Sequence, residues 1–446
     1  MGRRVVPRGI WFNPRPWVVA AGTILFLVLA LRQIPCVQTD PNNAVDAIIR
    51  LCYSDIPLTW ISGGLGTGAS PMGGEVLSYP PALAVLLMGL VALTKRLGFE
   101  VGVGVELEDQ LAAAQAYYGL TMVVLFVCFL VWILTLMWSQ PTRQRSWVAL
   151  TVAASPVVLA TGLISWELFG IALSSLAIFW LSRGKHLEAG LTLGLAASSA
   201  SMPFAVILAV VVALGLREEI GKAVAVVISA VVSFLLVHVP VLIQDTGAVL
   251  GYYRGQMSGS VSHGSVWYFL GLTGWTPREA GSLGFLLLVV FLLVVISWLY
   301  LAQRTPQVGS LIAAFCFASM LLAAGFTPQM SLWLLFALML ARPSRAQVVA
   351  FTLAHVSYWA AIWGWLAGHL TREKNGPENI YWLTVLLRVG VDVWVVVSAL
   401  RSSGAREDDE LLGVDAAELA PDDLVEAGGR HAARDGDLVA DSYERV

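Results

Sequence analysis

Long apolar stretches alternate with short polar ones along most of this chain. Three of the longest apolar stretches cover residues 18–31, 122–138 and 285–299. A helix needs roughly 20 mostly apolar residues to cross the hydrocarbon core of a bilayer, so repeated stretches of this kind are typical of transmembrane helices. The pattern predicts an all-α integral membrane protein, a polytopic bundle of about 11 to 13 transmembrane helices.

The composition agrees with this pattern. Hydrophobic residues make up 57% of the 446 positions and charged residues 13%, a charged share roughly half that of a soluble domain. A soluble fold could not bury so much apolar surface. Indole rings prefer the headgroup level of a bilayer, and many of the 17 tryptophans flank the apolar stretches: Trp11, Trp17, Trp138, Trp147, Trp267, Trp275 and Trp382.

Basic residues near helix ends predict the orientation, because cytoplasmic loops carry an excess of Lys and Arg. With Arg3 and Arg4 inside, the first span, about residues 17–34, carries the chain out. We interpret the short apolar stretch 80–94 as an interfacial helix within a first outer loop of residues 35–117. The later basic clusters then all fall inside: Arg143 with Arg145, Arg183 with Lys185, Arg217 with Lys222, Arg304, and Arg342 with Arg345.

We therefore expect a multi-pass protein of the plasma membrane with both termini in the cytoplasm. The first apolar stretch lacks a small-residue cleavage site after it, so we interpret it as a retained span. Residues 1–401 form the predicted transmembrane domain. Residues 402–446 form an acidic tail with almost no aromatic residues, which predicts disorder.

The four cysteines fall into two groups. Cys128 and Cys316 lie inside apolar stretches, where we expect inert packing residues. Cys36 and Cys52 lie in the first outer loop, where an oxidising environment would allow a disulfide. Two free thiols are the equal alternative.

The first outer loop also contains the strongest candidate for chemistry, Asp55 in the sequence CYSDIP. A carboxylate near the membrane surface can take a proton from a sugar hydroxyl that attacks an activated sugar carbon. Asp before a helix start is also a common helix cap, here for a helix starting at Ile56 and Pro57. On the residues alone, the capping role is favoured.

Other polar residues are predicted on the outer side: Glu167, Arg254, His263 and Gln329. Arg254 could bind a lipid phosphate bidentately or extend to the headgroups without a partner. His263 could be a second polar group at a reaction centre or a solvated loop residue. Arg388 and Asp392, four residues apart in the last span, predict an ion pair that neutralises both charges inside the bundle.

Six motifs, in this order, resemble a known family. They are CYSDIP (52–57), SYPP (78–81), SWELFGIALSSLAIFWLSRGK with the following LEAGLTLGLAASSASMPFAV (165–206), GSVWY (264–268), TPQMSLWLL (327–335) and IYWLTVLLRV (380–389). The order resembles the GT-C glycosyltransferases, and more narrowly the actinobacterial polyprenyl-phosphate-mannose-dependent α-mannosyltransferases of the DUF2029 (GT87) type.

The resemblance implies a GT-C-like fold with its active site in the first outer loop, and a hexosyltransferase activity with Asp55 as the base. The implied donor is a sugar, by analogy mannose, on a polyprenyl phosphate, and the implied acceptor is an envelope glycolipid or glycan. Tyr79, Glu167, Arg254, His263 and Gln329 would bind substrate or donor. We expect membrane lipids as further partners, and no nucleic acid, metal or cofactor.

Four positions depart from the family pattern: Ser78 replaces a glutamate, Glu167 replaces an aspartate, which is a milder change, and Ala200 and Ala324 replace basic residues. Among the expected site residues this leaves Arg254 as the main candidate for binding a phosphate. One alternative is a non-catalytic GT-C-like protein that binds lipid-linked glycans or supports envelope enzymes. A transporter is the third reading, and it would need polar residues near the bilayer midplane.

Overall fold

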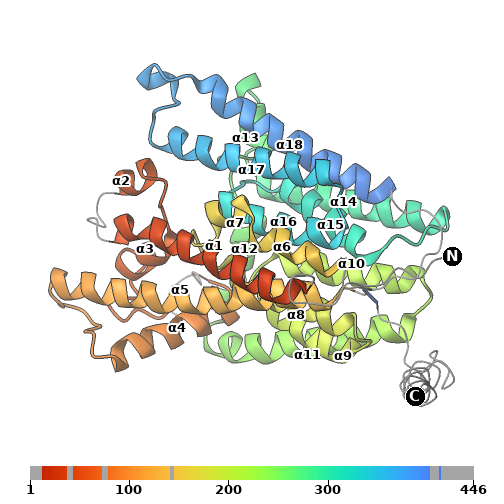
Figure 1. Ribbon diagram of the computed structural model, residues 1–446, viewed down its shortest axis with the longest axis horizontal. Helices are drawn as coiled ribbons and strands as arrows, with labels where there is room; N and C mark the ends of the chain where they lie inside the picture. The colour runs from red at the N-terminus through yellow and green to blue at the C-terminus, as the bar shows by residue number, and fades with distance from the viewer. Residues whose placement is uncertain (1–12, 38–43, 73–78, 141–144, 402–410, 413–446) are drawn as a thin grey trace, which may run out of the picture.

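The protein folds into a bundle of helices packed along one common direction (Figure 1). The computed structural model describes residues 13–37, 44–72, 79–140, 145–401 and 411–412. Within these ranges the regular elements are all helical. Of the acidic tail, these ranges include only Leu411 and Leu412, which are both 4% exposed and pack against the bundle core.

Six helices are long and apolar enough to cross a membrane. They are α1 (Pro14–Val37), α5 (Leu107–Trp138), α11 (Ile220–Gln244), α14 (Ala280–Leu301), α17 (Arg345–Leu366) and α18 (Glu378–Arg401). Their length and composition confirm the coarse prediction of a helical membrane protein.

Shorter apolar helices fill the space between the long ones. These are α6 (Val148–Ala153) and α7 (Pro156–Thr161), α8 (Glu167–Leu181), α10 (Met202–Leu216), α15 (Val308–Leu322) and α16 (Ser331–Leu340). α9 (His186–Ala197) follows α8 and packs against α8 and α11. α6 and α7 are separate because Ser155 caps α7 and Pro156 occupies its first position, where a missing N–H costs nothing.

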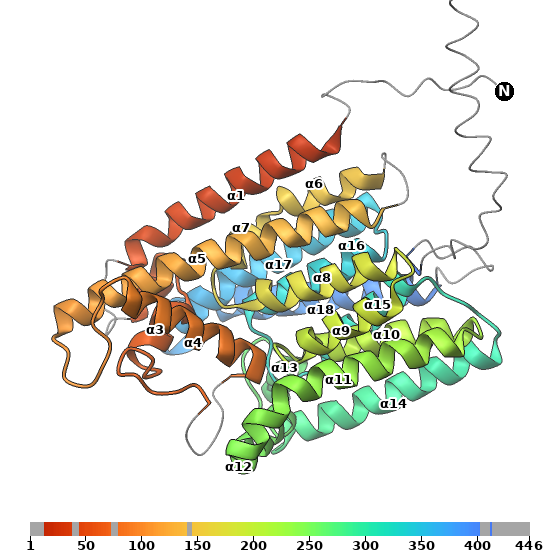
Figure 2. The same ribbon diagram turned by 90° about the horizontal axis from the view of Figure 1, so that it is seen from below.

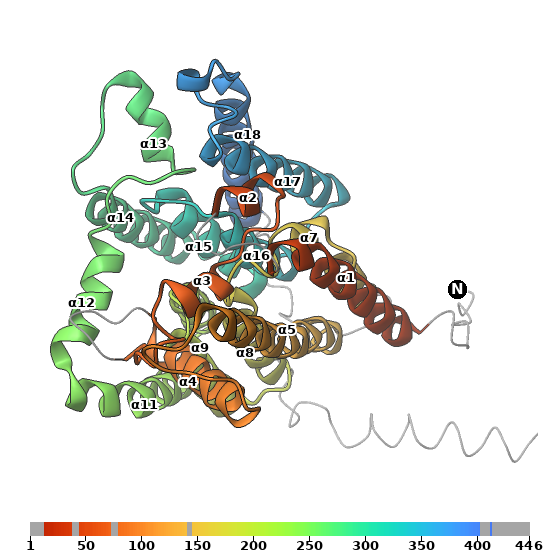
Figure 3. The same cartoon turned by 90° about the vertical axis from the view of Figure 1, so that its left-hand side faces the viewer.

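The core lies around α15 and α16, which stand near the middle of the bundle when it is viewed from one end (Figure 3). All ten residues of α16 are buried. α1, α11 and α14 lie at the periphery, and most residues in their apolar windows are not buried in the bundle. An apolar helix face that the protein leaves uncovered is expected to contact lipid.

A layer of short helices covers one end of the bundle, at the left in Figure 1. It contains α2 (Ala44–Ile49), α3 (Asp55–Ile61), α4 (Pro81–Arg96) and the first turns of α5. α5 has 32 residues and is therefore about 48 Å long, well beyond a hydrocarbon core of roughly 30 Å. Because its first turns carry Glu108 and Asp109, the end of α5 that contacts α3 and α4 is the one that projects. α4 covers the short apolar stretch for which the sequence predicts an interfacial helix.

The remaining helices are short connectors, and α12 lies next to one end of α11, at the lower left of Figure 2. They are α12 (Thr246–Met257), α13 (Val266–Leu270) and the 3-10 helices η2 (Arg145–Trp147), η3 (Gly271–Thr273), η4 (Pro328–Met330) and η5 (Arg372–Lys374).

Candidate functional site

A polar cavity of about 590 Å³ lies between the short-helix layer and the bundle. Four of the residues singled out from the sequence line it, although they lie far apart in the chain: Tyr79, Asp55, Glu167 and Gln329. Serine, threonine and glutamine side chains and five aromatic rings complete the polar wall: Thr59, Ser62, Ser165, Ser199, Ser201, Gln256, Tyr53, Tyr79, Trp166, Tyr252 and Trp333. Aromatic rings interspersed with hydrogen-bonding groups suit a ligand with both polar edges and apolar faces, such as a sugar.

Asp55 is held in place by its neighbour Ser54. The Ser54 hydroxyl accepts a hydrogen bond from the Ile56 amide at 3.3 Å, so Ser54, and not Asp55, caps α3. The same hydroxyl donates to the carbonyl of Leu163 at 2.7 Å, and the Asp55 amide donates to the carbonyl of Ile164 at 2.7 Å. Because Ser54 supplies the cap, the Asp55 carboxylate is left to face the cavity, and the capping interpretation of Asp55 is wrong.

The surroundings of Asp55 favour a protonatable carboxyl group. Burial raises the pKa of Asp55 above its ordinary value, and a hydrogen bond from the Tyr53 hydroxyl partly opposes this shift. The Tyr53 ring in turn packs on Trp363 of α17, with ring centroids 5.1 Å apart. A carboxylate with a raised pKa is a stronger base, which suits proton abstraction near neutral pH.

Glu167 is the second carboxylate of the cavity and the first residue of α8. Its Oε2 accepts a hydrogen bond from Nε1 of Trp333 at 2.5 Å. This contact fixes Glu167 against α16, so a ligand would meet a carboxylate whose position is already set. Tyr79 is held similarly: its hydroxyl lies 2.9 Å from Oγ1 of Thr59, and its ring packs edge-on against Trp166.

An apolar groove of about 420 Å³ adjoins the polar cavity. It runs between α10, α12, α14 and α15 and is lined mainly by alanine, leucine, phenylalanine and methionine side chains. Tyr252, Gln256, Met202, Met320 and Met330 line both spaces. The polar cavity therefore continues into a surface that suits a hydrocarbon chain.

Two predicted site residues do not reach the cavity. Tyr252 and Gln256 of α12 face it, and they lie four residues apart on one side of the helix. Arg254 lies midway between them, so its side chain points to the opposite side of α12, where it is exposed. Among the described residues that line the cavity, none is Lys, Arg or His.

His263 is the other exception. It is exposed in the loop before α13, its ring lies 5.0 Å from the ring of Tyr268, and its carbonyl accepts a hydrogen bond from the Phe326 amide at 3.0 Å. The expected convergence of Asp55, Arg254, His263 and Gln329 is therefore wrong for Arg254 and His263. Ser78 lies outside the described residues, Ala200 lines both the cavity and the groove, and Ala324 lines the groove.

The predicted ion pair between Arg388 and Asp392 is confirmed: Nη1 lies 2.9 Å from Oδ2, and both residues are 0% exposed. The structure adds His355, whose Nε2 lies 3.1 Å from Oδ1 of Asp392. Sequence reasoning missed this histidine because its partner is 37 positions away, and no local spacing connects the two.

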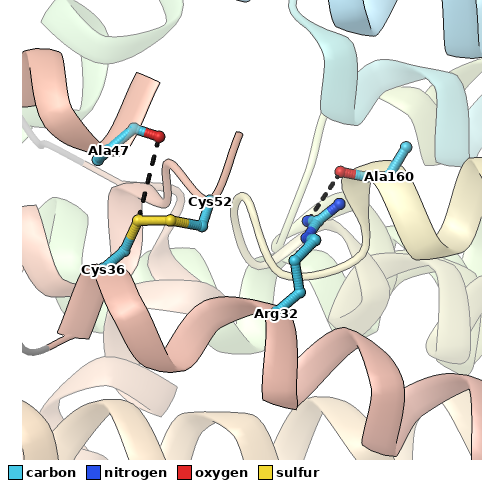
Figure 4. Close-up of a disulfide and its surroundings, with 5 residues drawn as sticks. All are labelled: Arg32, Cys36, Ala47, Cys52 and Ala160. Carbon is cyan, nitrogen blue, oxygen red and sulfur yellow. Dashed lines mark hydrogen bonds between the residues drawn. A yellow bond between two sulfur atoms is a disulfide. The ribbon is translucent and has the colours of Figure 1, made fainter. Parts of the chain in front are cut away.

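The first loop is closed by a disulfide between Cys36 and Cys52, with Cα atoms 5.9 Å apart (Figure 4). The bond joins the end of α1 to the segment that leads to Asp55. One turn earlier in α1, Arg32 donates from Nη2 to the Ala160 carbonyl at 3.1 Å (Figure 4). Its guanidinium also lies over the Trp359 ring, 5.3 Å from the centroid. Arg32 was also missed, although a single arginine in an apolar stretch is a visible signal.

In the described part of the chain, no group of three or more His, Cys, Asp or Glu side chains could hold a metal ion. Comparison with known proteins gave no match to any protein-family model and no match to any curated protein sequence.

Proposed function

We propose that this protein is a membrane glycosyltransferase, which moves a hexose, by analogy mannose, from a polyprenyl phosphate to an envelope glycolipid or glycan at the outer face of the plasma membrane. The observation that carries the proposal is the position of Asp55, in a polar cavity that continues into an apolar groove. A polyprenyl-phosphate sugar has the same division between a polar head and an apolar chain.

In the proposed reaction, the acceptor hydroxyl attacks the anomeric carbon of the donor sugar. The Asp55 carboxylate takes the hydroxyl proton as the new carbon–oxygen bond forms. The bond from the anomeric carbon to the phosphate oxygen breaks, and polyprenyl phosphate leaves with that electron pair. Glu167, fixed by Trp333, would accept hydrogen bonds from sugar hydroxyls, and Gln329 would donate to or accept from them.

The distribution of basic residues supports an outward-facing cavity. Glu167 lies at the cavity end of α8, and the 15 residues of α8 separate it from Arg183 by about 22 Å. Arg183 lies over the Phe179 ring, Phe179 packs on Trp138, and Arg15 lies over Trp138. Arg15 and Arg183 therefore mark the end of the bundle opposite the cavity, and basic ends are expected in the cytoplasm.

The family resemblance gains weight from the same geometry. CYSDIP, SWELFG and TPQMSLWLL supply Asp55, Glu167 and Gln329 respectively, and all three residues line one cavity. Motifs that were matched only by their order in the sequence thus meet in space, as the parts of one active site would.

Gene deletion with complementation tests the proposal. We expect the deletion strain to lose a hexose from its envelope lipoglycans, the wild-type gene to restore it, and Asp55→Ala to fail at equal protein level. Asp109→Ala, which removes an exposed carboxylate from the start of α5, should restore it and serves as the control. If Asp55→Ala restores the wild-type glycan profile in full, Asp55 is not the base.

One observation favours a second candidate, a non-catalytic protein that binds lipid-linked glycans. Among the described residues, the cavity wall contains two carboxylates and no cation to face a donor phosphate. Purified protein incubated with a short-chain polyprenyl-phosphate mannose, radiolabelled in the sugar, and a dimannoside acceptor separates the two candidates. Binding of the donor without any radiolabelled product would support the second.

A further inference from the structure

A buried polar network connects the cavity wall to the membrane-spanning helices α17 and α18. It begins at Ser331, the residue after Gln329 and Met330 of the cavity wall. The Ser331 hydroxyl lies 2.9 Å from Nδ1 of His355, and the contact of His355 with Asp392 and the ion pair of Asp392 with Arg388 extend the network. The four network residues, Ser331, His355, Asp392 and Arg388, are each at most 1% exposed.

The direction of each hydrogen bond follows from the chemistry of the groups. A carboxylate can only accept, so Nε2 of a neutral His355 carries the proton and donates to Asp392. Nδ1 is then an acceptor, and the Ser331 hydroxyl donates to it. With one cation and one anion the network has no net charge, as expected for a group buried in a membrane bundle.

Arg388 extends the network to a second segment, the loop that contains Gly264. Its Nη2 donates to the carbonyl of Gly264 at 2.7 Å, and its guanidinium lies 3.8 Å from the ring centroid of Phe326. The Gly264 amide donates to the Tyr381 hydroxyl at 3.0 Å, and the Tyr358 hydroxyl donates to the Phe326 carbonyl at 2.6 Å. Side chains of α17 and α18 thus bind the backbone at Gly264 and at Phe326.

Gly264 fits this position because it has no side chain. Its φ of +74° lies in the left-handed region, and a Cβ atom there would overlap the Tyr358 hydroxyl. The loop containing Gly264 pairs with the segment before η4: Ser262 N–H donates to the Ala324 carbonyl at 2.9 Å and Phe326 N–H to the His263 carbonyl at 3.0 Å. Three residues after Phe326, the chain reaches Gln329 in the cavity.

The serine, histidine and aspartate have the residue types of a nucleophilic triad, but their arrangement does not support one. Ser331 is 1% exposed and lines neither the cavity nor the groove. Asp392 is already neutralised by Arg388 at 2.9 Å, and a nucleophile needs a substrate carbon within reach. The network holds the chain and does not contact a substrate.

We propose that Ser331, His355, Asp392 and Arg388 are positioning residues, which fix the Gln329 side of the sugar cavity relative to the membrane-spanning helices. The proposal rests on the proposed function, because its consequence is a set position of the cavity wall for sugar transfer. The network acts through backbone and side-chain contacts at both ends of the 324–331 segment.

The test uses Ser331→Ala, because Asp392→Ala would leave a buried unpaired arginine and is expected to prevent folding. Ser331→Thr keeps the hydroxyl and is the conservative rescue. Ser229→Ala is the matched control, since Ser229 is also buried but bonds only carbonyls of its own helix, at Ala225 and Val226. Each substitution is made in full-length protein alone and together with Gln329→Cys.

Two readouts are measured on folded protein in membranes. The first is the rate at which N-ethylmaleimide labels the thiol introduced by Gln329→Cys; the native Cys128 and Cys316 are buried. Ser331→Ala should raise this rate about fivefold, the factor that corresponds to losing one hydrogen bond. The second is transfer from a short-chain polyprenyl-phosphate mannose, measured without the Gln329→Cys change, for which kcat should fall about tenfold while KM changes less than about threefold.

The outcomes are distinct. Faster labelling and lower kcat in Ser331→Ala, restored by Ser331→Thr and absent in Ser229→Ala, support the positioning role. Wild-type labelling and wild-type kcat in folded Ser331→Ala overturn it, even if that variant unfolds at a lower temperature. If wild-type protein transfers no sugar, the proposed function fails, while the labelling rate still decides whether the network positions the wall.

Discussion

Removing the hydroxyl of Ser54 should loosen α3 and displace the proposed base. The hydroxyl caps α3 by accepting from the Ile56 amide at 3.3 Å and also donates to the Leu163 carbonyl at 2.7 Å. A lost cap costs about 1 kcal/mol, and a lost buried hydrogen bond costs about another 1 kcal/mol. Ser54→Ala should therefore make local opening of α3 easier by about 2 kcal/mol, which is about a 30-fold change in its opening equilibrium.

Hydrogen exchange followed by mass spectrometry measures this opening directly. Peptides covering α3 should exchange about 30-fold faster in Ser54→Ala, while peptides from the buried helix α16 should be unchanged. Ser62→Ala is the control: its hydroxyl bonds the Leu58 carbonyl at the other end of α3, at 2.8 Å, but is exposed. That variant should alter exchange by no more than about threefold.

Sugar transfer provides the second measurement for Ser54→Ala. Because the cavity and groove proposed to bind the donor are otherwise intact, KM should stay within about threefold while kcat falls at least about tenfold. Equal exchange rates in Ser54→Ala and Ser62→Ala would refute the reasoning, since the clamp on Asp55 would then contribute nothing measurable. A reduced kcat with unchanged exchange would show that Ser54 acts by another route.

Three further predictions concern the disulfide, the hydrogen bond from Tyr53 to Asp55, and the apolar groove. Replacing Cys36 and Cys52 with serine opens a bridge of sequence separation 16, so unfolding in detergent should become about 3 kcal/mol easier, and dithiothreitol should reproduce the effect in wild type only. Tyr53→Phe removes a hydrogen bond that lowers the pKa of Asp55, so the pKa of Asp55 should rise. The acidic limb of the pH profile of kcat/KM should then move to higher pH, and an unmoved limb would contradict Asp55 as the base. Ala205→Trp places a large side chain in the apolar groove. It should raise KM at least about tenfold for a long-chain donor but less than about threefold for a short-chain donor. Equal increases would argue against the groove as the binding site of the polyprenyl chain.

The apolar stretches of the sequence were sufficient to predict a helical membrane bundle, because a bilayer accepts only backbones that satisfy their own hydrogen bonds. The ion pair of Arg388 with Asp392 was predictable for a similar reason: a spacing of four residues places both on one helix face. Features that depend on one element alone could be read from the chain.

Features that depend on several elements could not be read in this way. The capping role passed from Asp55 to Ser54 because the helix begins one residue earlier than expected, which the residue types alone leave open. Arg254 failed as a site residue because Tyr252 and Gln256 take the cavity face of α12, and the sequence does not say which face is turned inward.

The short loop between α7 and α8 positions both carboxylates of the cavity. The backbone of Asp55 is bonded to Ile164 at 2.7 Å, and Glu167 begins its helix three residues after that carbonyl. Arg32 of α1 donates a hydrogen bond to the carbonyl of Ala160, which lies in α7 just before this loop. The separation of Asp55 from Glu167 is therefore set by a short loop anchored to a membrane-spanning helix. Such anchoring is what a transferase needs, because a base displaced by about 1 Å loses much of its effect, whereas a protein that only binds glycans would tolerate that displacement.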